Sequence, residues 1–356
     1  MKKRWIMILI ISFMGVVPCH AADRLEIPGI DTFWNQTEEY GVEAGDDLEE
    51  GVEKLVVSLV GKGQQFVKEQ LRTSLSLVAV VLFCGLAQGM GQGGDKTGVA
   101  AVELAGAMSI TALTMTDMAA MIGLGRETVR KMRAFSDALL PVMATLSAAS
   151  GNVTGAAVRQ GITVLFSQLL IDCMDQFLIP MVYSYVVISC ACAAVGNAGL
   201  DKLAGLIKSG ATFLLTSILL VFVGYLTASG AIAGSVDASA VKAAKLAISR
   251  AVPVVGGILA DASETVLAGA GTLKSSVGAA GMLVILAICL IPFLRLAIHY
   301  LMYKVTAALC ATIAQPRLSK LIDGIGGAFG LVLGMTGAAG LVLMISLVSA
   351  LKVVIP

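Results

Sequence analysis

Apolar stretches about as long as a membrane span recur along this sequence, and they constrain the fold more than any other feature. A helix needs about 20 apolar residues to cross the hydrocarbon core of a bilayer. Over the whole chain 57% of the residues are hydrophobic and 14% are charged, whereas soluble domains have about 25% charged residues. We predict an all-α, polytopic membrane protein. Its clearest apolar stretches are residues 74–90, 177–195, 211–231, 277–294, 296–314 and 327–350.

Two further stretches decide how many times the chain crosses the membrane. Residues 99–124 contain two carboxylates, and residues 139–170 contain Pro141. We therefore expect six to eight spans. If residues 74–90 and 99–124 both cross, the basic run at residues 126–133 lies outside, against the rule that positive segments stay inside. One of the two is then expected to be re-entrant or interfacial.

The N-terminus has the pattern of a secretory signal peptide. A basic start, MKKRW, is followed by a short apolar stretch and a small-residue exit near Ala21. We assign residues 1–22 to this signal peptide, with an uncleaved signal anchor as the alternative. Residues 23–72 follow as a short acidic extracytoplasmic segment that holds half of the 24 acidic residues. Residues 73–356 form the helical membrane domain.

The segment AFSDALLPVMATLSAASGN, residues 134–152, is too broken for a good span and too apolar for a loop. A helix that starts near Asp137 has Pro141 about one turn in, where proline is best tolerated, and ends at Gly151. Such a helix re-enters the membrane or packs inside a bundle. Pro141 and Pro292 are the expected helix breaks.

No pattern for catalysis or for binding a metal or cofactor stands out. In GMGQGGDKTG, residues 89–98, Asp95 separates the lysine from the last glycine before it, whereas a phosphate loop needs the two adjacent. After the signal the chain keeps one histidine, His299, which argues against multi-histidine metal sites. The net charge of +1, without basic and aromatic clusters, argues against nucleic acid as a partner. We expect a protein that is not an enzyme.

Arg295, His299 and Tyr303 recur every four residues, which places them on one helical face beneath a kink expected at Pro292. Ionisable groups at membrane depth usually face a bundle interior or a hydrated cavity. One interpretation is therefore a polar path or a subunit contact. The other is that Arg295 marks the junction of two spans and extends its guanidinium to the headgroups. Its place between two apolar stretches favours the second.

Small residues form a smooth stripe on the last span. Gly326, Gly330, Gly334 and Ala338 are spaced four residues apart, which lets another helix approach to backbone contact. The stripe is equally compatible with packing inside the bundle and with packing between copies in a homo-oligomer.

The basic run RETVRKMR and the following DALLPVMATLSAASGN resemble the corresponding stretch of the stage III sporulation protein AE family, polytopic membrane proteins of endospore-forming bacteria. The segment IPFLRLAIHYLMYKVTAALCATIAQPRLSKLIDGIG, residues 291–326, and the glycine-rich last span agree with this resemblance. The similarity runs from about residue 71 to the C-terminus. It is weakest over the signal and the acidic segment.

The resemblance implies a part in a transenvelope complex that links the mother cell to the forespore and is needed for forespore development. The expected partners are a secretion-type ATPase and ring-forming proteins of the same sporulation stage, and the expected location is the mother-cell membrane. The resemblance implies a platform or gate in a secretion-like channel and no catalytic residues. The alternative is a free-standing secondary transporter for a small solute, with a midplane site at helices broken by Pro141 and Pro180.

Overall fold

The computed structural model describes residues 48–90, 96–149, 155–228, 249, 255–260, 276–313 and 316–354. These residues are almost all helical and include no strand, which confirms the predicted all-α class. The helices are α3 (Leu48–Met90), α4 (Lys96–Ala149), α5 (Gly155–Cys173), η1 (Met174–Leu178), α6 (Ile179–Val195), α7 (Ala198–Ala228), α10 (Ser276–Ala311) and α11 (Pro316–Val354).

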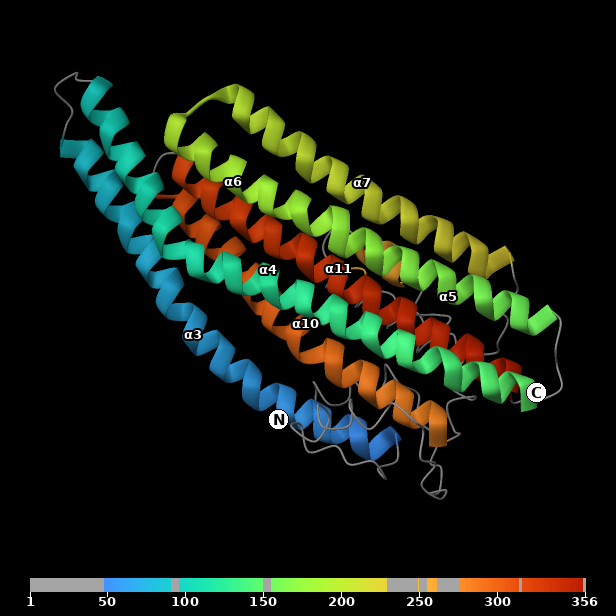
Figure 1. Cartoon of the computed structure of the whole chain (residues 1–356). Helices are drawn as coiled ribbons and strands as arrows, with labels where there is room; N and C mark the ends of the chain where they lie inside the picture. Colours follow the sequence, from blue (N-terminus) through green and yellow to red (C-terminus); the bar gives the residue numbers. More distant parts are fainter. Residues whose placement is uncertain are drawn as a thin grey trace.

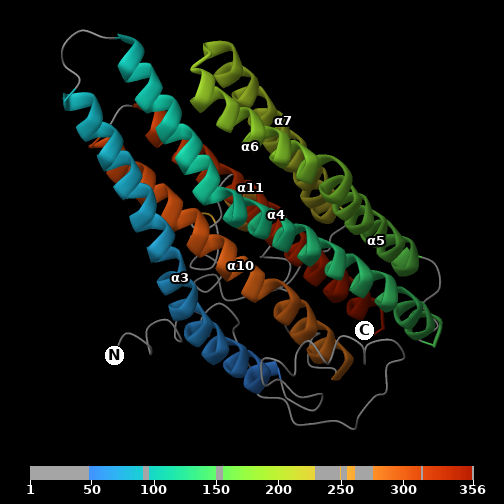
Figure 2. The same ribbon diagram turned by 60° about the vertical axis from the view of Figure 1, so that its left-hand side comes forward.

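The long helices lie side by side in one bundle (Figure 1). α3, the α5–η1–α6 run and α10 point in one direction, and α4, α7 and α11 point in the other (Figure 1). Both views place α11 in the middle, with α3 and α7 on opposite sides of it (Figure 2). α11 packs against α10, α4, α5 and α6, whereas α3 packs against α10 and α4.

α11 supplies most of the core of this bundle. In its 18-residue apolar window 89% of the residues are buried, against 17% to 50% in the other candidate spans. Phe329, Leu331, Val332 and Leu333 point to different sides of the helix, yet each is at most 1% exposed. A helix that is apolar all round is stable only where other helices surround it. The composition of α11 therefore accounts for its central place.

Six helical segments in the described part of the chain are long and apolar enough to cross a membrane. This agrees with the prediction of six to eight spans. One detail of that prediction is wrong, because residues 277–294 and residues 296–311 of the next apolar stretch belong to the single helix α10, which passes through Pro292. A proline removes one backbone hydrogen bond and kinks a helix, but packed neighbours allow the helix to continue.

The prediction of a separate short helix that starts near Asp137 is also wrong. α4 starts 41 residues earlier, at Lys96, and continues through Pro141 to Ala149. The break expected at Pro141 is therefore absent. α3 likewise continues across residue 72, where the acidic segment was expected to end, because the composition changes there while the helix does not. The predicted signal peptide, residues 1–22, lies outside the described residues.

The contact between α10 and α11 provides a test of the packing. A Cβ atom added at Gly326 would lie 3.1 Å from the Tyr303 Cβ and 3.6 Å from the Lys304 backbone nitrogen. Gly326→Leu is therefore expected to lower the free energy of unfolding by about 2 kcal/mol, because the two helices must separate. The measurement is thermal unfolding of the purified protein in detergent. Gly205→Leu is the control, since nothing lies within 4 Å of its Cβ, and equal losses in both variants would contradict the prediction.

Candidate functional site: charged contacts between the helices

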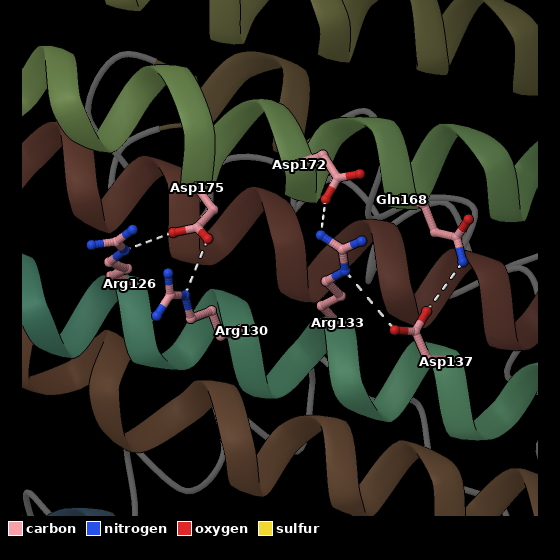
Figure 3. A network of polar contacts seen from close by, with 7 residues as sticks. All are labelled: Arg126, Arg130, Arg133, Asp137, Gln168, Asp172 and Asp175. Atoms are coloured by element: carbon pink, nitrogen blue, oxygen red, sulfur yellow. Dashed lines mark hydrogen bonds and ion pairs between the residues drawn. The ribbon is translucent and has the colours of Figure 1, made fainter.

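The side of α4 that faces α5 and η1 is lined with charged groups. Residues 126, 130, 133 and 137 are spaced four, three and four apart, which places them on one face of a helix. The facing helix has the reverse pattern at residues 175, 172 and 168, as two antiparallel helices require. Figure 3 shows the network of Arg126, Arg130, Arg133, Asp137, Gln168, Asp172 and Asp175.

Asp175 binds two arginines at once. Arg126 Nε donates to Asp175 Oδ1 at 2.7 Å, and Arg130 Nε donates to Asp175 Oδ2 at 3.1 Å. The Asp175 side chain is 20% exposed, while the arginines are 42% and 57% exposed. Bonds between ionised groups are stronger than neutral ones, but water screens such exposed arginines. We therefore expect each ion pair to contribute about 1 kcal/mol at most to the free energy of unfolding.

The rest of the network extends the contact by two turns. Arg133 donates to Asp172 across the helices and lies 3.9 Å from Asp137 on its own helix. Gln168 Nε2 donates to Asp137 Oδ1 at 3.2 Å. The network therefore fixes the position of α4 along α5 as well as the distance between them.

The two aspartates flank the start of η1, where the helical winding changes. η1 is one π-helical turn, and the backbone N–H of Ile179 donates to the carbonyl oxygen of Met174, five residues earlier. Met174 and Leu178 point into the core, while Asp175 faces α4. π-helical turns are frequent at functional sites. The ion pairs of Asp172 and Asp175 therefore join α4 to its neighbour beside a turn of unusual backbone geometry.

On sequence alone, Asp172 and Asp175 most simply mark the end of the apolar stretch at residues 177–195. The signal that the sequence analysis missed is the match between two spacings, four-three-four on α4 and three-four before that stretch. Each spacing places its polar residues on one face of a helix, and the basic face of one helix complements the acidic face of the other in an antiparallel pair.

A second ion pair lies near the end of the bundle where α4 and α11 begin. Arg317 Nη1, in the first turn of α11, donates to Glu103 Oε2 on α4 at 2.7 Å. The Glu103 side chain is 9% exposed and that of Arg317 is 43% exposed. Gly196 ends α6 in the left-handed conformation, with φ of 72°, directly beside the Arg317 guanidinium. The pair supplies the partner that a buried carboxylate requires.

The polar residues predicted on α10 occupy two environments. His299 and Tyr303 are buried in the bundle, and the Tyr303 hydroxyl donates to Asp117 Oδ2 on α4 at 3.0 Å. Arg295 is half-buried, with its guanidinium 5.2 Å from the centre of the Phe66 ring on α3. It lies in the middle of α10 and therefore does not join two spans.

The predicted small-residue stripe lies inside the single chain. Gly326, Gly330, Gly334 and Ala338 are all buried, and Gly326 faces Tyr303 on α10. A contact of this stripe with a second copy remains a prediction.

Within the described residues, no group of three or more His, Cys, Asp or Glu side chains is placed to hold a metal ion. The geometry described above joins helices to one another through ion pairs and hydrogen bonds. We therefore treat these contacts, and not a pocket, as the candidate functional site.

The model of the family described as stage III sporulation protein AE matches residues 41–353. The chain belongs to this family. The resemblance inferred from the sequence is thus confirmed. The stage III sporulation protein AE of Bacillus subtilis (strain 168) is 22% identical over 319 residues, which cover 85% of this chain and 79% of that protein. No solved structure matches the chain. Family and helices together identify a sporulation membrane protein.

The arginine network makes a prediction about Asp175. Asp175→Asn removes the negative charge between Arg126 and Arg130, so we expect the free energy of unfolding to fall by about 1 kcal/mol at low salt. The loss should shrink at high salt, because ions screen exposed charges. Denaturation in detergent at two salt concentrations measures both effects. Glu127→Gln, which removes only a pair within α4, is the control, and a loss independent of salt would argue against the network.

Gly196 makes a second prediction. An alanine there is strained at a φ of 72°, and its Cβ would clash with the Arg317 guanidinium. Gly196→Ala should therefore lower the free energy of unfolding by about 1–2 kcal/mol. Gly205→Ala, with open space around its Cβ, should have no such cost. Thermal unfolding of the two variants decides the matter, and the prediction fails if their midpoints are the same.

Proposed function

We propose that this chain is a non-enzymatic, multi-pass platform in the transenvelope channel complex that links the mother cell to the forespore. Membership in the stage III sporulation protein AE family supports a role in sporulation. The observation that carries the platform role is the length of the helices. α3 has 43 residues and α4 has 54, or about 65 and 80 Å at 1.5 Å per residue, whereas the hydrocarbon core is about 30 Å thick.

The exposed apolar side chains support a position for the membrane. On α4 the exposed large hydrophobic residues lie between positions 104 and 115, and on α10 between 301 and 309. The ion pairs of Glu103 and of Arg126 border this part of α4, and 23 residues separate them, which is about 35 Å. We propose that lipid surrounds the bundle between these two charged layers.

The other half of the bundle then extends beyond the membrane. α3 carries charged and amide side chains along residues 49–69, and α4 carries exposed charges along residues 126–137. Charged groups are costly in lipid and favourable in water, which supports this placement. A rigid projection of this kind provides a surface for soluble components, which we propose to be the secretion-type ATPase or the ring-forming proteins. The proposed location is the mother-cell membrane around the forespore.

The structure does not favour the alternative of a secondary transporter. It relied on helices interrupted at Pro141 and Pro180, which would expose backbone groups to a solute at the membrane midplane. α4 is continuous through Pro141, and Pro180 lies at the second residue of α6, directly after η1, in an unbroken helical run.

Deletion of the gene in its sporulating host tests the proposal. We expect forespore development to stop after engulfment and the wild-type gene to restore it. Photo-crosslinking residues then test the platform role in the complemented strain. One replaces Glu127, 63% exposed on the projecting half, and the matched control replaces Phe213, 73% exposed within the proposed lipid belt.

We expect Glu127 to crosslink to other proteins of the complex and Phe213 to crosslink only to lipid. Normal sporulation without the gene would reject the sporulation role. Arrested sporulation with no protein crosslink from the projecting half would reject the platform role.

A further inference from the structure

A line of buried polar side chains leads into the membrane part of the bundle between α3, α4 and α10. α3 and α10 are parallel neighbours, since Gly63 lies against Leu294 and Phe66 against Arg295. Along this seam, the Gln70 side chain lies close to the hydroxyl of Tyr303, which donates to Asp117. The seam therefore leads from Arg295 to a carboxylate on α4.

Asp117 lies well inside the proposed lipid belt. It is 14 residues from Glu103 and nine from Arg126, or about 21 and 14 Å along the helix. Its hydrogen-bond partner is the neutral Tyr303 hydroxyl, and within the described residues it forms no ion pair. This distinguishes it from Glu103, which binds Arg317. A carboxylate at membrane depth needs a partner of opposite charge or a proton.

Three buried groups along the same seam lack a hydrogen-bond partner within the described protein. They are Gln70 Nε2, Ser74 Oγ and Arg295 Nε. Gln70 is 2% exposed and Ser74 is 7% exposed. Buried polar groups without protein partners are usually satisfied by water. Because the groups follow one another turn by turn along α3 and α10, the water that satisfies them would form a file.

The titratable groups around the seam come from each of its helices. α3 contributes Glu69, and α10 contributes His299, whose ring lies within electrostatic range of Glu69, Asp117 and Arg295. His299 Nδ1 donates to the Arg295 carbonyl oxygen at 2.9 Å. α11 closes the seam with Phe329, whose ring meets the Tyr303 ring edge-on at 5.0 Å.

One ion pair stands next to this seam. Lys304, which follows Tyr303 on α10, donates to Asp323 Oδ1 on α11 at 2.6 Å. Lys208 on α7 lies within electrostatic range of both. Lys304 is thus paired with Asp323 on α11 and is not the partner of Asp117 on α4.

We propose that Asp117 is an intramembrane proton-binding site, reached by water along the seam between α3 and α10. Uptake forms one O–H bond on the carboxylate. The Tyr303 hydroxyl then turns from donating to Asp117 to accepting from it, and its own O–H turns to a water molecule in the seam. Release reverses these steps, so no other reactant is needed. This role rests on the lipid belt placed under the proposed function, but it does not depend on the proposed partners, because it involves only the membrane part of one chain.

Reaction with a lipophilic carbodiimide tests proton binding, because the reagent modifies protonated carboxyl groups in an apolar setting. The full chain is treated in lipid nanodiscs over a range of pH, and modified sites are identified by mass spectrometry. We expect carbodiimide modification at Asp117 that decreases as the pH rises. Glu103, held by Arg317, is the internal control and should stay largely unmodified. Tyr303→Phe, which preserves the ring, should move the pH profile of Asp117.

Absence of pH-dependent modification at Asp117, or equal modification at Glu103, would overturn the proton-binding site. The water route has a separate test. Ser74→Cys, nearly equal in size, should react with a small charged thiosulfonate added from water, at least tenfold faster than the native Cys84 on the same helix. Cys84 is a suitable control because its sulfur faces the close contact with Gly106. No preference for the new cysteine would overturn the route.

Discussion

Close packing around α11 is the constraint on which the rest of the bundle depends. Between helices in lipid the hydrophobic effect gives little attraction, so association relies on close van der Waals contact. Glycines provide that contact on several helices. Added Cβ atoms would meet Val332 at Gly125 of α4, Leu347 at Gly281 of α10 and Cys289 at Gly340 of α11. At these contacts the helices can therefore approach closely.

The charged contacts complement this packing, because contacts between small residues alone do not fix the position of one helix along another. The pair of Glu103 and Arg317 sets the position of α11 along α4, and the bonds of Asp175 set that of α5 along α4. A shift by one turn, about 5.4 Å, would break these bonds. Packing thus decides which helices meet, and charge decides where along their length they meet.

Much of the fold follows from the sequence, since stretches of about 20 apolar residues indicate spans directly. The central place of α11 was also within reach, because its residues are apolar or small on every side. The limits of the helices could not be predicted from the sequence. A proline indicates a helix break locally, but contacts with other helices can keep the helix continuous. Pro141 and Pro292 both lie inside continuous helices. At Pro292 the helices packed against α10 stabilise a backbone that would break in isolation.

The candidate site shows a different limit. The face of Arg295, His299 and Tyr303 could be predicted from the four-residue spacing, whereas the partner Asp117 lies 186 residues from Tyr303 along the chain. A contact of that separation depends on how α4 and α10 align, and nothing local encodes it. Glu103 and Arg317, 214 residues apart, were missed for the same reason.

The order of the helices along the chain affects how the protein is made. α11 is the last of the described helices to be synthesised, yet it is the one that the others surround. The earlier helices therefore enter the membrane before their common core exists, and their small-residue faces have no permanent partner. Until α11 arrives, they depend on lipid or on insertion factors to cover those faces. A chain that stops before residue 316 therefore lacks the helix that supplies most of the buried core.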